Sequence, residues 1–406
     1  MKVIIIGGGI GGLALAQGLK SNGIAFHIFE RDSNLKERQQ GYRLRISSNG
    51  RQALRRLLNQ SSWNLLLDTS AQLDDIGFWK ISAIEGNEEE GKLVRPDKVN
   101  SELEKEKSLK VDREIFRNVV LMNGISSDEI TFGKEFLNYT RLPDGQIQCF
   151  FKDNSSVTAN FLIGADGGKS KVAAQYLPIE KIDTGIRAIY GKTMFYSSFQ
   201  AALNPKLNQK MSISTEVQGD GTKLVLFSEP VYFNKLNLIK HHCSTDDYLY
   251  WVFLSKVKTF DSAFGEGFNQ SNSLFGEALL KLTGRWMPDL RSVLEHQVRN
   301  DTGLMKVSSV DPQKLRNLRW QPSQIVLLGD AIHLMSPASG SGANLALEDA
   351  SHILDAFIHG KNDIDAVIDK IGVYESKMRE YASQTIAINS EVGAKMFGQE
   401  KFTLDV

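Results

Sequence analysis

The 406-residue sequence predicts an α/β protein that has a parallel sheet with helices, an inserted, mainly antiparallel sheet, and a C-terminal helical segment. Three observations lead to this class. Apolar runs at 3–6 and 325–330 lead through glycines into helical patterns, as buried parallel strands do. Residues 183–299 contain aromatic-rich, strand-like runs with few helical patterns between them. Residues 363–398 return to helical periodicity.

The first thirty residues have the pattern of a complete β-α-β unit. Residues 3–6 are an apolar run, residues 10–19 have helical periodicity, and residues 25–29 form a second strand that ends at Glu30. Glycines interrupt the apolar segment at its start. A buried strand therefore explains this segment better than a cleaved signal peptide does.

The glycines between the first strand and the helix, "GGGIGG", have the Gly-x-Gly-x-x-Gly spacing of a dinucleotide-binding turn. Gly7 makes the tight turn, Gly9 lets the backbone approach a pyrophosphate, and Gly12 lets the helix pack closely on the strand. Glu30 follows at nearly the spacing expected of an acid that accepts hydrogen bonds from ribose hydroxyls. Its charge would repel a 2′-phosphate, so the motif predicts an NAD-like or FAD-like nucleotide.

A second glycine-rich stretch, "FLIGADGGKS" (161–170), resembles a nucleoside triphosphate loop but has the wrong spacing. Three residues separate Gly164 from Gly168, whereas the triphosphate loop needs four. Asp166 would also place a negative charge beside the phosphates. These two features argue against a nucleotide-hydrolysing protein.

A third stretch, "LLGDAIHLMSPASGSGANLALEDA" (327–350), joins a buried strand to a long helix through small residues. The strand ends at Asp330, whose carboxylate suits ribityl or ribose hydroxyls. Gly340, Gly342 and Ala343 leave backbone N–H groups uncovered near a helix N-terminus, which favours a phosphate or a partly anionic ring.

The composition excludes several classes of protein. Lys plus Arg equals Asp plus Glu at 48 each, which indicates no nucleic-acid partner. The two cysteines, Cys149 and Cys243, have no metal-ligand spacing and fit a reducing, cytoplasmic setting without disulfides. No run reaches the roughly 18 apolar residues of a membrane span. We therefore expect no metal site and no integral membrane segment.

Four motifs in this order, "GGGIGG…FERD", "VDREIF", "GADGGKS" and "GDAIHLMSPASGSGANLALEDA", resemble the FAD-dependent single-component monooxygenases, a family that includes aromatic hydroxylases and epoxidases. The resemblance implies a Rossmann-like FAD-binding domain with an inserted substrate domain. The expected division is an FAD-binding domain at 1–80, 100–182 and 300–362, a charged insertion at 81–99, a substrate domain at 183–299 and C-terminal helices at 363–406.

The resemblance also implies which residues contact FAD. The adenosine end would be held by the glycine-rich turn and Glu30, the dinucleotide region by Arg113, and the ribityl or pyrophosphate region by Asp330. Arg43, in "GYRLRI", matches a stretch that runs beside the flavin. The expected cofactor-binding set is Gly7, Gly9, Gly12, Glu30, Arg43, Arg113, Asp166, Asp330, Gly340, Gly342, Ala343 and Asn344.

The activity that the resemblance implies is chemistry by the cofactor. NAD(P)H would reduce the flavin, and O2 would form a flavin hydroperoxide that hydroxylates or epoxidises an apolar or aromatic small molecule, for example in the tailoring of secondary metabolites. Arg187 and Tyr190, on the first strand of the second domain, are the candidate catalytic residues. Their alternative interpretation is a surface arginine and an ordinary sheet tyrosine.

The sequence departs from the family at one position. The Asp166 motif in the family continues Ser-x-Val-Arg, whereas this chain has Ala173 in place of the arginine. Lys169 or Lys171 would then be the cation available to NADH or NADPH. The departure keeps open an FAD-dependent oxidase, dehydrogenase or cyclase on the same scaffold that does not insert oxygen.

Overall fold

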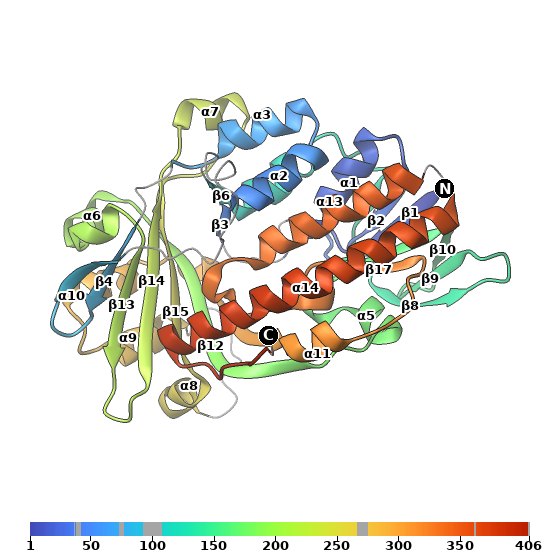
Figure 1. Ribbon diagram of the computed structural model, residues 1–406. Coiled ribbons are helices and arrows are strands. Elements are labelled where there is room, and N and C mark those ends of the chain that lie inside the picture. Colours follow the sequence, from blue (N-terminus) through green and yellow to red (C-terminus); the bar gives the residue numbers. More distant parts are fainter. Residues whose placement is uncertain are drawn as a thin grey trace.

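The computed structural model describes residues 1–35, 37, 42–72, 77–91, 108–265, 275–360 and 363–404. It contains a five-stranded and a seven-stranded sheet, and one long C-terminal helix reaches from the first to the second (Figure 1). The predicted fold class, an α/β protein with a parallel sheet, an antiparallel sheet and C-terminal helices, is confirmed.

The five-stranded sheet is parallel throughout its described pairs. Its strand order is β17 (Ile325–Leu327), β11 (Phe161–Gly164), β1 (Lys2–Ile6), β2 (Ala25–Phe29) and β7 (Ile130–Thr131). Val3, Ile4 and Ile5 on β1 are fully buried. Helices α1 (Ile10–Ser21) and α13 (Gly342–Gly360) contribute to the same hydrophobic core, which explains why the strands are continuous apolar runs.

Smaller elements surround this sheet. A three-stranded antiparallel sheet consists of β8 (Phe136–Arg141), β9 (Ile147–Phe151) and β10 (Ser156–Ala159). Strands β3 (Arg43–Ile46) and β6 (Leu109–Asp112) form an antiparallel pair. The helices are α2 (Ser48–Leu57), α3 (Gln60–Thr69), α4 (Arg113–Ile115), η2 (Phe116–Val120), η3 (Gly167–Lys169), α5 (Lys171–Tyr176), α11 (Pro312–Asn317), α12 (Asp330–His333) and η7 (Pro337–Ser339).

The seven-stranded sheet has the order β16 (Gly303–Val310), β12 (Lys181–Met194), β15 (Tyr248–Lys256), β14 (Lys223–Val231), β13 (Ser212–Val217), β4 (Phe78–Ser82) and β5 (Glu88–Gly91). Its described pairs are antiparallel except that of β13 with β4. Strands β4, β5 and β16 come from outside 183–299. They join because β4 pairs with β13 and with β5, and β16 pairs with the long strand β12.

A second hydrophobic core packs against this sheet. It includes Trp251, Phe253 and Trp286, and the helices that contribute to it lie beside the strands. These and the remaining helices are α6 (Ser197–Ala202), η4 (Pro205–Asn208), α7 (Lys235–Lys240), α8 (Val257–Phe264), α9 (Phe275–Leu282), α10 (Pro288–Glu295) and η6 (Arg299–Asp301). Within the expected charged insertion at 81–99, residues 81–91 belong to the β4–β5 hairpin, and residues 92–99 lie outside the described residues.

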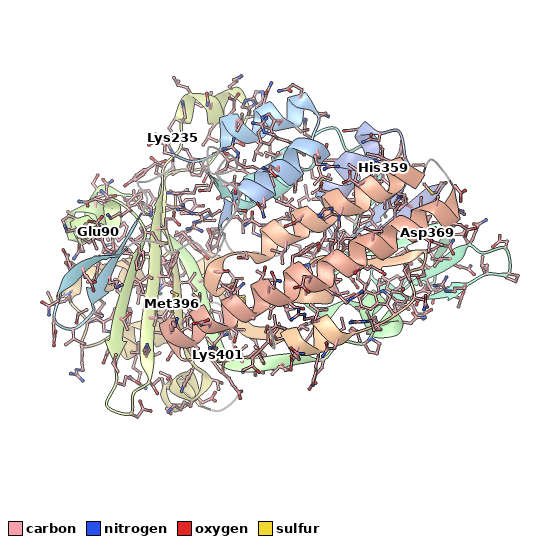
Figure 2. The ribbon with its side chains drawn as sticks, viewed as in Figure 1. Glu90, Lys235, His359, Asp369, Met396 and Lys401 are labelled. Atoms are coloured by element: carbon pink, nitrogen blue, oxygen red, sulfur yellow. The ribbon has the colours of Figure 1, made fainter. Side chains whose placement is uncertain are left out.

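Helix α14 (Ile364–Phe397) runs along α13 and reaches from the parallel sheet to the seven-stranded sheet (Figure 1). Asp369 near its start lies on the side of the parallel sheet, and Met396 near its end lies beside the seven-stranded sheet (Figure 2). The Tyr374 hydroxyl donates to the Leu327 carbonyl at 2.8 Å, which ties α14 to β17. None of the described helices is long and apolar enough to cross a membrane.

Candidate functional site

Four motif segments come together at the carboxyl edge of the parallel sheet. Strand β1 leads into the glycine-rich turn, β2 into Glu30, β11 into Asp166 and β17 into Asp330. Because the strands are parallel, these ends lie at one edge of the sheet. Ligands of open α/β sheets bind in the crevice outside this edge.

The three motif glycines meet different surroundings. Gly7 has a φ of +109°, and a Cβ there would lie 2.3 Å from the Ala165 carbonyl oxygen. A Cβ on Gly12 would lie 2.2 Å from the Gly7 carbonyl oxygen, so backbone packing requires both glycines. A Cβ on Gly9, by contrast, would have no heavy atom within 4 Å. Gly9 therefore keeps the N-terminus of α1 open to an approaching ligand.

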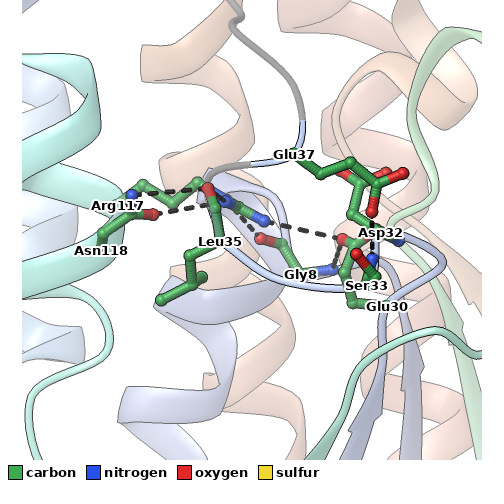
Figure 3. A network of polar contacts seen from close by, with 8 residues as sticks. All are labelled: Gly8, Glu30, Asp32, Ser33, Leu35, Glu37, Arg117 and Asn118. Atoms are coloured by element: carbon green, nitrogen blue, oxygen red, sulfur yellow. Dashed lines mark hydrogen bonds and ion pairs between the residues drawn. The ribbon is translucent and has the colours of Figure 1, made fainter.

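Glu30 is held beside this turn by backbone amides (Figure 3). Its Oε2 accepts from the Gly8 N–H at 2.7 Å, and its Oε1 accepts from the Asp32 N–H at 3.0 Å. Arg117 donates through Nε to the Gly8 carbonyl at 2.8 Å and lies 3.8 Å from the Glu30 carboxylate. The acid is thus fixed, buried and charge-paired at the position expected to receive a ribose.

Arg117 is a site residue that the motif analysis did not find. It lies on η2, four residues after Arg113, and its side chain joins the glycine-rich turn to the Leu35 carbonyl at 3.1 Å. The available signal was its spacing: residues four apart on a helix lie on the same face. The motif "VDREIF" contains Arg113, and Arg117 is the first residue after the motif.

Asp330 and Arg113 both line one large cavity at the edge of the parallel sheet. The Asp330 side chain is exposed to this cavity, yet its position deep in the protein raises its pKa by desolvation, against the opposing charges of His333, Lys181 and Arg113. Desolvation lowers the pKa of Arg113 to about 10, with Arg117 adding to the effect and Asp330 among the groups that oppose it. A carboxylate and a guanidinium in such surroundings gain from hydrogen bonds to a bound ligand.

A buried network supports the turn that carries Asp330. Asp349, on α13, accepts hydrogen bonds from the Gly329 N–H at 2.8 Å and from Tyr381 at 2.5 Å. His333 Nε2 lies 2.7 Å from the same carboxylate. Gly329 has a φ of +61°, in the region that favours glycine. The network therefore fixes the backbone from which Asp330 projects.

The Asp166 carboxylate caps helix α5. It accepts from the Ser170 hydroxyl at 2.5 Å and from the Lys171 N–H at 2.7 Å. Its charge thus occupies the helix N-terminus that a triphosphate loop would offer to phosphates, which gives a structural reason for rejecting that motif. Of the two candidate lysines, Lys171 pairs with Glu135 at 2.8 Å, whereas Lys169 lines the cavity.

The expected flavin-flanking residues lie next to Asp330. Gly340 has a φ of +68°, and a Cβ on Gly342, the first residue of α13, would lie 4.0 Å from the Asp330 carboxylate. Asn344 uses its amide differently: it accepts from the Ser47 N–H and donates to the Arg45 carbonyl, each at 2.9 Å. Asn344 therefore ties β3 to the start of α13. Ala343, also in the expected set, follows Gly342 on the same helix.

The cavity has a volume of about 2650 Å³ and lies between these residues and one face of the seven-stranded sheet. A drug-sized ligand needs roughly 300–1,000 Å³, so the cavity can hold a dinucleotide and a second molecule. On this sheet, a row of half-buried side chains faces the cavity, and its members lie directly opposite one another on neighbouring strands. The row consists of Ile213, Phe227, Val252 and Tyr190.

The two candidate catalytic residues differ in their contacts. Tyr190 stands in this row, and burial raises its pKa while the charge of Arg113 opposes the shift. Arg187 also lines the cavity, but its guanidinium forms two hydrogen bonds with the Asp183 carboxylate, at 3.0 and 3.1 Å. Tyr190 therefore lies within reach of the charge of Arg113, on the dinucleotide side of the cavity. Arg187, by contrast, is already paired with a carboxylate.

Arg43 lines the same cavity but reaches across to the seven-stranded sheet. It forms an ion pair with Glu229 on β14, and its guanidinium lies over the rings of Phe227 and Tyr250, at 5.6 and 5.9 Å from their centroids. Sequence reasoning placed Arg43 beside the flavin and did not single out Glu229, which belongs to no motif.

These features fit FAD. The open glycine at Gly9 suits a pyrophosphate, the amide-held Glu30 suits a ribose, and Asp330 faces the cavity where a ribityl chain would lie. Among the described residues, no group of three or more His, Cys, Asp or Glu side chains could hold a metal ion.

Comparisons with known families and proteins agree with this arrangement. An FAD binding domain model matches residues 289–387, and an NAD(P)-binding Rossmann-like domain model matches residues 5–52. Over 98% of its length, the chain is 32% identical to the dual O-methyltransferase/FAD-dependent monooxygenase elcB of Phaeosphaeria nodorum and 33% identical to CTB3, of the same description, from Cercospora beticola. The chain spans 45% and 46% of these relatives, or about half their length.

Solved structures share the fold. A crystal structure from Photorhabdus luminescens, assigned as an FAD-containing monooxygenase, aligns with a TM-score of 0.78 and 26% identity, covering 98% of both chains. Klebsiella pneumoniae HpxO, solved with FAD and uric acid, aligns with a TM-score of 0.75 and 20% identity, covering 98% of this chain and 90% of its own. The second likeness shows the fold alone.

Proposed function

We propose that this chain, which is similar to FAD-dependent monooxygenases over nearly its whole length, uses FAD, NAD(P)H and O2 to hydroxylate or epoxidise an apolar or aromatic small molecule. The observation that carries the proposal is one cavity whose wall includes Arg113, Asp330 and Gly340 on one side and an apolar sheet face on the other. A cofactor at the motifs and a substrate on the sheet would share this space.

In this proposal the chain binds and orients the cofactor and the substrate, and bound FAD supplies the electron transfer and oxygen activation. Glu30 would hold the adenosine ribose, Arg113 the dinucleotide backbone and Asp330 the ribityl hydroxyls. The α13 N-terminus, at Gly342, would stabilise negative charge on the ring. The apolar sheet face would exclude water from the reacting atoms and hold the substrate against the ring.

The substrate side has support from Tyr190. Its side chain lines the cavity within the electrostatic reach of Arg113, and burial raises the pKa of the phenol. A protonated phenol at this position can donate a hydrogen bond that orients a substrate oxygen. Arg187 has a positioning role here, through Asp183, which also pairs with Lys306 at 3.0 Å.

Two of the relatives combine O-methylation and oxygenation in one protein, according to their names. We propose that this chain corresponds to the oxygenating part of such an arrangement and acts in the tailoring of a secondary metabolite. Lys169, which lines the cavity, is the proposed cation for NADH or NADPH.

A second candidate function is an FAD enzyme that does not insert oxygen. Ala173 favours it, since this residue stands where the family has an arginine and is only 3% exposed. An absorbance spectrum of the FAD-loaded protein tests both candidates. We expect the flavin bands to bleach with NADPH or NADH and to recover in air, with oxygen consumption that rises with substrate. Bands that neither coenzyme bleaches would favour the second candidate, and failure to bind FAD would contradict both.

A further inference from the structure

We infer that Arg43 is a substrate-binding residue, and that it receives a carboxylate or phenolate oxygen of a planar aromatic substrate. The inference rests on the proposed function and names the substrate class for the same cavity. Its basis is a guanidinium that comes from the dinucleotide side of the cavity and is fixed on the substrate side.

The direction of the Arg43 side chain is the first step. Arg43 begins strand β3, which α13 holds in place through Asn344. Its guanidinium nevertheless contacts β14 and β15, through the ion pair with Glu229 and the rings of Phe227 and Tyr250. The side chain therefore belongs to the wall that the seven-stranded sheet contributes.

Glu229 is the anchor of this arrangement. Its side chain is fully buried, and three cations converge on it: Arg43, Arg45 at 2.7 Å and Lys110 at 3.4 Å. Lys110 is fully buried as well, and also donates to the Pro230 carbonyl at 2.9 Å. Burying a carboxylate is costly unless cations pair with it, so this cluster is built to hold its guanidinium groups in fixed positions.

A fixed arginine is suited to an acidic oxygen. A guanidinium carries five N–H donors in one plane, so one arginine can hold an anchoring carboxylate and a ligand oxygen together. Hydrogen bonds to charged acceptors are about twice as strong as neutral ones. Because Glu229 already restricts the Arg43 side chain, little further conformational entropy is lost when a ligand binds.

The surroundings of Arg43 select a planar ligand. Tyr250 lies directly opposite Glu229 on the neighbouring strand. The rings of Phe227 and Tyr250 meet edge to face, with their centroids 6.2 Å apart. Both rings are half-buried and line the cavity. Burial raises the pKa of Tyr250 to about 12, so its hydroxyl remains a neutral donor beside the guanidinium. An aromatic ring would pack on this surface with its acidic group at Arg43.

The test compares two probes of one shape on the FAD-loaded protein without NAD(P)H: 2-naphthoate and the neutral 2-naphthamide. Calorimetry gives their dissociation constants. We expect the acid to bind at least about tenfold more tightly, a ratio that one charge-assisted hydrogen bond supports. Arg43→Gln should abolish this preference and leave the affinity for FAD unchanged.

Two further variants make the test specific. Phe227→Leu should weaken both probes alike and keep their ratio, because it removes ring surface and no charge. Arg56→Gln, which breaks an ion pair with Asp355 on the surface, is the matched arginine control and should leave both constants unchanged.

Three results would overturn the inference. They are an unmodified protein that binds both probes equally or neither at about 1 mM, an Arg43→Gln protein that keeps the preference, and an Arg43→Gln protein that loses FAD affinity. The last would return Arg43 to the cofactor site. The proposed function fails differently, through absent FAD binding or absent NAD(P)H oxidation by the unmodified protein.

Discussion

His333 and Asp349 form a fully buried pair, with Nε2 of the histidine 2.7 Å from the carboxylate, beneath the turn that presents Asp330 to the cavity. Two acids of the stretch 327–350, Asp330 and Asp349, therefore have separate roles. Asp349 holds the Gly329 N–H and His333, while Asp330 faces the ligand space. This division leads to the first two predictions.

His333→Gln should lower stability in a pH-dependent way. Burial lowers the pKa of His333, but the charge and hydrogen bond of Asp349 more than offset this and leave the pKa raised. A raised histidine pKa stabilises the fold below the unfolded value of about 6.5, and this contribution is lost as the pH rises through the folded pKa. We expect a difference of roughly 1–3 kcal/mol from the unmodified protein at acidic pH, smaller at alkaline pH. Denaturant unfolding at about pH 6 and pH 9 measures it, and a difference that does not fall with pH would contradict the paired histidine.

Asp330→Asn should weaken FAD binding and leave the fold intact. The carboxylate faces the cavity, so removing its charge affects the ligand more than the packing. We expect about a tenfold or greater loss of FAD affinity, measured by flavin fluorescence during titration. Asp220→Asn, which breaks an exposed pair with Lys258, is the control and should bind FAD normally. Full FAD affinity in Asp330→Asn would remove this acid from the site.

Gly9→Ala and Gly12→Ala should separate ligand binding from folding. A methyl group at position 9 meets open space, so we expect a stability loss of less than about 1 kcal/mol together with weaker FAD binding. A methyl group at position 12 would lie 2.2 Å from a backbone oxygen, so the FAD-free protein itself should lose roughly 1–3 kcal/mol. Thermal unfolding with and without FAD tests both. Equal effects of the two substitutions on the FAD-free protein would contradict this difference between the glycines.

Glu30→Arg should weaken FAD binding by more than about tenfold, because it reverses the charge that is expected to face the ribose. Glu30→Gln keeps the size of the side chain and one acceptor oxygen for the Gly8 and Asp32 amides. Its smaller effect would separate the loss of charge from the loss of these backbone contacts. Unchanged FAD content in Glu30→Arg would contradict the ribose assignment.

The parts of the site that depend on local spacing could be predicted from the sequence. Gly7, Gly9 and Gly12 follow a strand at fixed intervals, and each has the surroundings that its position in the motif demands. Glu30 and Asp330 come directly after buried strands, so the parallel sheet alone places them at one edge. These relationships need only a short strand and the turn that follows it.

The substrate side depends on contacts between distant parts of the chain. Arg45 and Glu229 are 184 residues apart, and no periodicity in either segment indicates that they meet. Strands β4 and β16 join the seven-stranded sheet through pairing with β13 and β12, which hydrophobic pattern alone does not specify. For the same reason the sequence placed Arg43 beside the flavin, while its side chain extends to the opposite wall.

The length of α14 has a mechanical consequence. At 1.5 Å per residue, its 34 residues form a rod of roughly 50 Å. The rod packs on α13 beside the parallel sheet and on β14 and β15 of the other sheet. Hinge bending between the two walls of the cavity would break one of these contacts, unlike the opening of two lobes on a flexible linker. We therefore expect a ligand to enter without a change in the separation of the two walls.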